Sequence, residues 1–280
     1  MESHRLDGRI AFVTGAGSGL GREIALAFAR AGARVAVNDL RPEAAKSVHE
    51  ELRGLGGALP CGPLIGDVSE SSAVAGWFAV LAGATGGQLD VMVNNAGFAD
   101  TDPETEERTR VQVTEMMQTG RVTTSLEATS RLSDERWQRM LRVHLDGAFH
   151  GTREALRLMQ PRRSGRVINI ASIAGLTGIG RTPHYSAAKA GIIGLTRAVA
   201  RDVAPLGILV NAIAPGYVDT PLLDVLGDQR AMQSAIIAAQ TPLGRLGEPR
   251  EIASVALFLA GDGASFFTGQ VLSPNGGIVI

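Results

Sequence analysis

Short apolar runs alternate along the chain with longer stretches of helical periodicity. The apolar runs predict seven β-strands, over residues 9–15, 33–39, 59–67, 89–95, 165–172, 208–215 and 268–274. Helical spacing of apolar residues predicts a helix that ends near residue 31 and further helices over 42–52, 70–83, 133–159, 183–204 and 248–260. Strands that alternate with helices form right-handed βαβ units, and nearly continuous apolar strands suit a sheet covered on both faces. We therefore predict an α/β fold, a doubly wound parallel seven-stranded sheet flanked by helices, in a single domain over 1–280.

One segment departs from this alternation of strands and helices. Residues 98–132 are polar, rich in threonine and charge, and long for a connection. They follow the carboxyl end of a strand, where open α/β sheets bind ligands. The segment is therefore interpreted as a long insertion that acts as a lid or an oligomer arm, or as a mobile surface loop.

Composition narrows the class of protein. The 27 basic and 28 acidic residues give a net charge of −1, and 4% of residues are aromatic, so we expect no nucleic-acid partner and no membrane attachment. Cys61 is the only cysteine, which excludes an intrachain disulfide and offers no zinc site, and we expect no metal. No run of 18 apolar residues occurs. We expect a cytoplasmic protein.

A glycine-rich turn follows the first predicted strand. Residues 14–21 read TGAGSGLG, with Gly15, Gly19 and Gly21 at a spacing that differs from G-x-G-x-x-G. Glycines allow a tight turn and a close approach of backbone to phosphate. The helix that begins here offers free N–H groups to a pyrophosphate. The turn therefore predicts a dinucleotide site.

Asp39 ends the second predicted strand, 18 residues after Gly21. At that place a carboxylate can accept hydrogen bonds from the adenosine ribose and would repel a 2′-phosphate. This favours NAD as cofactor. Arg41 leaves NADP open, because an arginine there could pair with a phosphate. The other reading of Asp39 is an ordinary turn residue.

Residues 184–191, HYSAAKAG, place Tyr185 four residues before Lys189 in a predicted helix, so the two side chains share a face. Alone, this pair could be a surface tyrosine beside a solvated lysine. The pair does not stand alone, because the chain also has the glycine turn, Asp67-Val68, NNAG at 94–97, Ser172 and P-G-x-V-x-T at 215–220. With these motifs the chain resembles the classical short-chain dehydrogenase/reductase family, including its 3-oxoacyl reductases, over essentially its whole length. The resemblance implies a Rossmann fold.

The resemblance also implies catalytic roles. Tyr185 would be the general acid/base, with its pKa lowered by the ammonium of Lys189, and Ser172 would bind the substrate oxygen. Where the family usually has asparagine, this chain has His144. A neutral imidazole could replace that amide in a proton relay to the lysine, or His144 could be purely structural, or the change could slow the enzyme. We expect His144 to be neutral at pH 7.

By the same resemblance, the cofactor NAD would be bound by a set of residues along the carboxyl edge of the sheet. They are Gly15, Ser18, Gly19, Leu20, Gly21, Asp39, Asp67, Val68, Asn94, Ala96, Gly97, Tyr185, Lys189, Pro215, Gly216, Val218 and Thr220.

The family places its substrate lid at 217–247, a segment that carries several apolar residues, namely Leu222, Leu223, Val225, Leu226, Met232, Ile236 and Ile237. With Ala174, Leu176 and Ile179, they predict a mostly apolar pocket for a small-molecule substrate. We expect His184 to be an exposed residue at a helix start, or else to touch substrate.

These features predict an oxidoreductase that transfers a hydride between NAD(H) and a secondary alcohol or ketone, with a 3-hydroxyacyl or 3-oxoacyl thioester as one option. The alternative is a non-catalytic NAD(P)-binding regulatory or scaffold protein of the same fold. We also expect a homotetramer, from family habit and the apolar C-terminal stretch GQVLSPNGGIVI.

Overall fold

The centre of the molecule is a parallel sheet. The computed structural model describes residues 5–223 and 230–280. Within them, seven strands form the parallel sheet that the sequence predicts, and their order is β3-β2-β1-β4-β5-β6-β7. Their bounds are β1 Ile10–Val13, β2 Arg34–Asp39, β3 Leu64–Ile65, β4 Val91–Asn94, β5 Gly165–Ile170, β6 Ile208–Ile213 and β7 Val271–Leu272.

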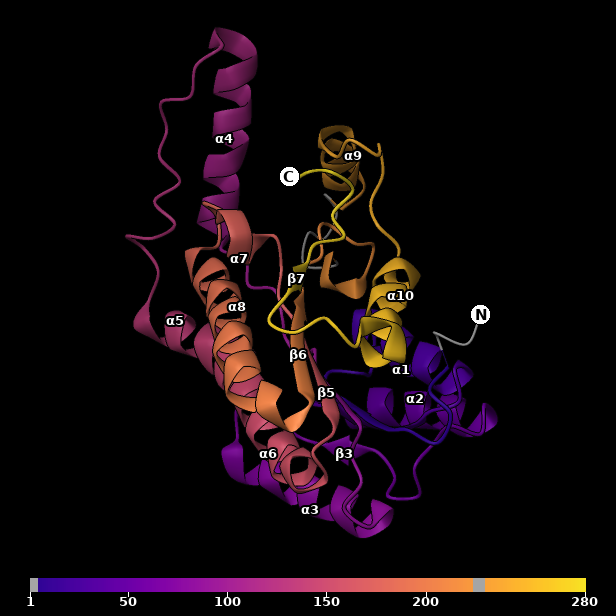
Figure 1. Ribbon diagram of the computed structural model, residues 1–280. Helices are drawn as coiled ribbons and strands as arrows, with labels where there is room; N and C mark the ends of the chain where they lie inside the picture. Colours follow the sequence, from indigo (N-terminus) through magenta and orange to yellow (C-terminus); the bar gives the residue numbers. More distant parts are fainter. Residues whose placement is uncertain (1–4, 224–229) are drawn as a thin grey trace.

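Helices cover both faces of the sheet (Figure 1). One face carries α1 (Gly19–Arg30), α2 (Pro42–Gly54) and α10 (Pro249–Ala260), and the other carries α3 (Ser71–Thr85), α6 (Gly147–Arg162) and α8 (Pro183–Val203). In β1, Ala11 and Val13 belong to the core on the first face, while Ile10 and Phe12 belong to the core on the second. Because each face needs apolar side chains, the strands are apolar at consecutive positions.

The two edge strands are shorter than predicted. The expected strand over 59–67 contributes only β3, and an isolated bridge joins Val35 to Ala58, just before the predicted range. The expected strand over 268–274 contributes only β7. Each edge strand pairs on one side only, so fewer of its residues are fixed in the ladder.

The long helix predicted over 133–159 is divided. It begins as expected at Ser133, whose hydroxyl accepts a hydrogen bond from the amide of Arg136 at 3.4 Å. After α5 (Asp134–Leu141), residues Arg142–Asp146 form a π-helix, and α6 then runs to Arg162. A π-helical turn inside an α-helix is often found at functional sites, and this one contains His144.

The insertion at 98–132, here called the arm, contains a helix that the periodicity did not predict. This helix, α4 (Pro103–Thr119), extends away from the sheet and its covering helices (Figure 1). Of its described residues only Thr105 is buried, so α4 has no apolar stripe. Local signals do mark it: Asp102 caps its first turn, accepting from the amide of Thr105 at 3.0 Å, and Gly120 ends it.

The rest of the arm returns along α4 and is fastened to it. The Glu115 carboxylate accepts hydrogen bonds from the amides of Thr123 and Thr124, at 2.8 and 3.1 Å. These bonds lower the pKa of Glu115 to about 2. Arg108 pairs with Glu127 at 2.9 Å. The arm is therefore a helix with an irregular return segment bound along it.

Two further helices were not predicted, α7 (Ala174–Thr177) and α9 (Arg230–Gln240). Both flank the carboxyl edge of the sheet, where α7 follows β5 and α9 follows β6. None of the described helices is long and apolar enough to cross a membrane.

Candidate active site

The glycine turn between β1 and α1 has the geometry that phosphate binding requires. Gly15 and Gly19 have φ of 60° and 54°, in the left-handed region that favours glycine. Ser18 precedes α1 and its side chain makes no capping hydrogen bond to the helix. A side chain at Gly21 would collide with the carbonyl oxygen of Gly15, 2.3 Å from the new Cβ. The turn thus exposes the first N–H groups of α1 to a ligand.

Asp39 lies against this turn at the end of β2. Its carboxylate accepts hydrogen bonds from the amides of Gly17 (2.9 Å) and Arg41 (3.0 Å). The Arg41 guanidinium reaches back to the Ser18 hydroxyl at 2.9 Å and forms an ion pair of 3.4 Å with Asp39. Asp39 is 7% exposed and lines the pocket described next. The carboxylate therefore both shapes the turn and faces the pocket.

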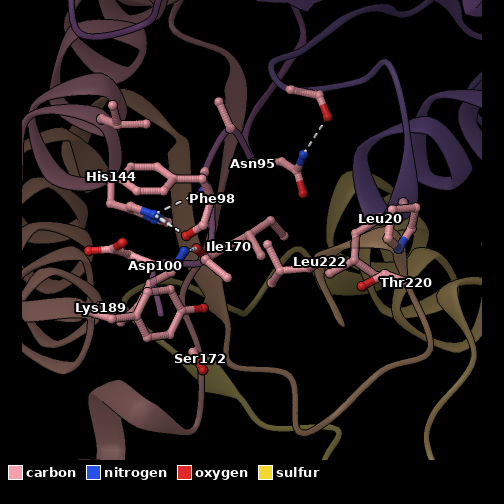
Figure 2. A pocket seen from close by; sticks show the side chains of 18 of the residues that line it. Leu20, Asn95, Phe98, Asp100, His144, Ile170, Ser172, Lys189, Thr220 and Leu222 are labelled. Atoms are coloured by element: carbon pink, nitrogen blue, oxygen red, sulfur yellow. Dashed lines mark hydrogen bonds between the residues drawn. The ribbon is translucent and has the colours of Figure 1, made fainter. Parts of the chain in front are cut away.

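A pocket of about 740 Å³ runs along the carboxyl edge of the sheet. Figure 2 shows Ser172, Lys189 and His144 on one side and Leu20 and Thr220 on the other. The pocket is lined by most of the predicted cofactor residues, namely Gly15, Ser18, Gly19, Leu20, Asp39, Asp67, Val68, Ala96, Gly97, Tyr185, Lys189, Pro215, Gly216, Val218 and Thr220.

Two predicted cofactor residues do not line this pocket. Gly21 lies behind the turn, where it packs closely on Gly15. The Asn94 side chain points into the protein interior and donates hydrogen bonds to Thr152 (2.9 Å) and Asn169 (2.8 Å). Its neighbour Asn95 lines the pocket instead. Successive side chains of a strand point to opposite sides, so only one asparagine of the pair can face the pocket.

Helix α8 and the end of β5 bring the predicted catalytic residues together. Tyr185 and Lys189 lie one turn apart on α8, and Ser172 follows β5. The Lys189 ammonium lies 5.6 Å from the centre of the Tyr185 ring. It donates a 2.8 Å hydrogen bond to the carbonyl of Ile170 on β5. Lys189 is only 4% exposed, so the solvated-lysine alternative is excluded.

The electrostatics differ from the expectation that Lys189 lowers the pKa of Tyr185. Burial raises the pKa of the Tyr185 phenol above its usual value, and the opposing effect comes from its hydrogen bond with Ser172. Burial also lowers the pKa of Lys189 to about 7. A lysine that is only partly charged at neutral pH stabilises a phenolate weakly, which explains why the expectation fails in the free protein.

His144 is buried at 3% exposure, in the π-helical turn. Its Nε2 lies 3.1 Å from the amide nitrogen and 3.0 Å from the carbonyl oxygen of Phe98. Its ring meets the Tyr185 ring edge-on, with centres 5.3 Å apart. Burial, and then the nearby Lys189 charge, hold the pKa of His144 well below its usual range. His144 is therefore neutral at pH 7, as expected.

The space that His144 occupies depends on Gly97. A Cβ added at Gly97 would lie 2.4 Å from Cε1 of the His144 ring. Within residues 5–223 and 230–280, the other ring nitrogen, Nδ1, is buried without a hydrogen-bond partner, and so is Oδ1 of Asn94. Both residues line a cavity of about 10 Å³, roughly the room needed by one water. Over the same residues no hydrogen bond joins His144 directly to Lys189.

His184 corrects the expectation of an exposed residue, because it is 2% exposed. Its Nε2 lies 3.1 Å from Oδ2 of Asp100, which also accepts a 2.9 Å hydrogen bond from Arg136. Asp100 lines the pocket from the base of the arm, and its pKa is lowered: burial raises it, but the hydrogen bonds from Arg136 and His184 outweigh that effect. The sequence does not indicate this contact, since nothing local to either residue shows that the base of the arm meets α8.

The substrate side is only partly as predicted. Leu222, Leu223 and Ile179 line the pocket, whereas Ala174, Leu176, Ile236 and Ile237 do not. Val225 and Leu226 lie outside the described residues, as does the side chain of Met232. Ile173 and Tyr217 complete the apolar part of the wall.

The fold, the glycine turn and the arrangement of Ser172, Tyr185 and Lys189 define a nicotinamide-dependent oxidoreductase, and the chain belongs to the short chain dehydrogenase family, whose sequence profile matches residues 9–231. It is 34% identical to the 3-oxoacyl-[acyl-carrier-protein] reductase FabG of Thermotoga maritima, over 99% of this chain and 100% of that one. It is 36% identical to the (2S)-[(R)-hydroxy(phenyl)methyl]succinyl-CoA dehydrogenase subunit BbsD of Thauera aromatica, over 97% of each. A short-chain type dehydrogenase/reductase from Mycobacterium marinum superposes with a TM-score of 0.84 at 31% identity, over 99% and 98% of the chains.

Proposed function

We propose that this protein transfers a hydride between NAD(H) and a secondary alcohol or ketone, with Tyr185 as general acid/base. The observation that carries the proposal is that Ser172, Tyr185 and Lys189 line the same pocket as the glycine turn. The relatives named as a 3-oxoacyl-[acyl-carrier-protein] reductase and as a (2S)-[(R)-hydroxy(phenyl)methyl]succinyl-CoA dehydrogenase subunit support a 3-oxoacyl or 3-hydroxyacyl thioester as one substrate.

The residues present suit a dinucleotide. The glycine turn and the first N–H groups of α1 would hold the pyrophosphate. Asp39 would accept from the adenosine ribose, and its charge opposes a 2′-phosphate. Pro215, Gly216 and Thr220 also line the pocket and would contact the nicotinamide. When bound, the nicotinamide ring donates the hydride in reduction and takes it up in oxidation.

The chain's own residues would transfer the proton and bind the substrate oxygen. In ketone reduction, Tyr185 gives its phenolic proton to the substrate oxygen while Ser172 donates a hydrogen bond to it. The raised pKa of Tyr185 keeps the phenol protonated, which is the state that reduction requires. Lys189 holds a proton beside Tyr185, and Ile170 fixes the position of its ammonium. Neutral His144 would take part in returning the proton to Lys189, through a water.

The test is Tyr185→Phe. The variant should lose at least ~10²-fold in turnover, because the general acid is removed, while NAD binding persists. The chain's only other tyrosine is Tyr217, so Tyr217→Phe is a matched control that should reduce turnover far less. Full activity of Tyr185→Phe would refute the mechanism. Tight NAD binding by the parent without turnover of a broad alcohol and ketone panel would instead favour the non-catalytic scaffold.

A further inference from the structure

Arg181 lies in the loop between α7 and α8, four residues before Tyr185 in the chain. The loop is held in place by two hydrogen bonds of Ile179, whose amide donates to Ser186 Oγ at 2.9 Å and whose carbonyl accepts from the Thr182 amide at 3.0 Å. Arg181 is half-buried and lines the pocket. Its backbone therefore has a fixed position on the substrate side of the site.

No described residue neutralises the charge of Arg181. Across residues 5–223 and 230–280, its guanidinium takes part in no ion pair or side-chain hydrogen bond. Two carboxylates at the base of the arm, Asp100 and Asp102, pair with Arg136 at 2.9 and 3.6 Å. A half-buried cation has lost part of its hydration, and such groups are ordinarily paired.

The other arginines that line the pocket differ from Arg181. Arg41 is bound to Asp39 and Ser18. Arg139 stacks on the Phe98 ring, with its guanidinium 4.8 Å from the ring centre, and both Arg139 and Arg142 are exposed. Among the arginines that line the pocket, Arg181 is thus the half-buried one that has no charge partner in the described residues.

We infer that Arg181 binds an anionic group of the substrate. A guanidinium offers a planar fork of donors that matches a carboxylate or a phosphate. Apolar side chains line the same pocket, among them Ile173, Ile179, Leu222 and Leu223. The substrates are therefore ketones or secondary alcohols with an apolar body and an anionic oxygen group, an inference that rests on the proposed function.

The experiment compares matched ketones with NADH as reductant. One pair is acetoacetate and its neutral ethyl ester, which tests a carboxylate. The other is acetoacetyl-CoA and the neutral N-acetylcysteamine thioester of acetoacetate, which tests a phosphate-bearing carrier. The quantity measured is the preference, the ratio of kcat/KM for the anionic ketone to that for its neutral partner.

In Arg181→Gln, the preference should fall about 10- to 100-fold in one of the two pairs, because a charge-assisted hydrogen bond is lost. Arg181→Lys should keep part of it, since the charge remains without the fork. Arg197 on α8 is exposed and does not line the pocket, so Arg197→Gln is the control and should change the preference less than about twofold.

The two pairs separate the two sources of the anion, because a loss in the first identifies a carboxylate and a loss in the second a phosphate. An unchanged preference in both pairs in Arg181→Gln, with the ketones still reduced, would overturn the inference and leave the proposed function standing. If the parent reduces none of the four ketones and nothing in a broader panel, the proposed function fails, and the inference with it.

Discussion

The Lys189 ammonium donates a 2.8 Å hydrogen bond to the carbonyl oxygen of Ile170. This bond ties the catalytic helix α8 to the end of β5, two residues before Ser172. Lys189 has no carboxylate partner at this position among the described residues, and burial lowers its pKa to about 7. The site is thus held in place by a cation whose charge destabilises the fold.

The first prediction concerns the stability that the fold loses by burying the charge of Lys189. The unfolded lysine binds its proton up to about pH 10.5, whereas the folded one releases it near pH 7. The buried charge therefore lowers the free energy of unfolding by its full amount below pH 7. This loss shrinks as pH rises and vanishes above pH 10.5. Lys189→Met should raise the free energy of unfolding at pH 7 by up to about 4 kcal/mol, and by much less at pH 10.

Urea unfolding at both pH values measures this difference. The chain's only other lysine, Lys46, is exposed and pairs with Glu43, so Lys46→Met is the matched control and should show no gain. A Lys189→Met variant that is less stable than the parent at pH 7 would contradict the assignment.

The second prediction is that the two reaction directions depend oppositely on pH. Ketone reduction needs a protonated Tyr185 and a charged Lys189, so its kcat/KM should fall above about pH 7, where Lys189 loses its proton. Alcohol oxidation needs Tyr185 to accept a proton, and its raised pKa means that oxidation should still be accelerating at pH 9. Initial rates at saturating cofactor from pH 6 to 10 measure both, and parallel profiles would speak against these roles.

The fold was largely predictable, because an element that packs against neighbours keeps its buried positions apolar. Those positions leave a strand or helix pattern in the sequence. The interior strands and α8 lie close to their predicted bounds for this reason. Helix α4 could not be found by periodicity, because Thr105 is its only buried residue and no apolar stripe marks one face. The π-helical turn escaped prediction as well, since a single extra residue leaves no mark in the apolar pattern around Arg142–Asp146.

The site residues were predictable where regular secondary structure determines the side on which a side chain lies. Tyr185 and Lys189 share a helix face, and Ser172 follows a central strand. The contact between Asp100 and His184 was not predictable, because it depends on how the arm leaves β4. The raised pKa of Tyr185 was missed because the sequence shows a nearby charge but does not show the burial that outweighs it.

The third prediction concerns cofactor choice. Asp39→Ala should lower the ratio of NAD to NADP affinity, because the ribose loses its acceptor and the 2′-phosphate loses a repelling charge. The released Arg41 would then be available to a phosphate. Titration of both cofactors by protein fluorescence gives the ratio, and an unchanged ratio would show that Asp39 only shapes the turn through Gly17.

The fourth prediction concerns His144. His144→Asn should fold and turn over within about tenfold of the parent, since an altered relay removes only part of the acid–base contribution. His144→Ala should be clearly slower and should shift the pH–rate profile, because the space beside Tyr185 and Gly97 is emptied. If His144→Ala matches the parent in rate and in pH dependence, His144 has a structural role only.

The fifth prediction is a homotetramer in solution. Trp137 and Phe149, on the two halves of the divided helix, are 38% and 44% exposed, and Phe266 is fully exposed. Apolar side chains left on the surface of one copy are commonly covered by others in closed symmetric assemblies. Light scattering at micromolar concentration should give four times the mass of the chain, and a monomer would be inconsistent with this proposal.

The π-helical turn at Arg142–Asp146 lets one continuous helix point its two halves independently. A residue added to an α-helix rotates everything after it by about 100° around the axis. Here α5 can keep its face on α8 while α6, out of phase with it, keeps its own face on α3 and β4. Deleting any one residue of the turn would therefore rotate α6 and change which of its sides meets the sheet. A change within five residues would alter the packing of the whole second half of the helix.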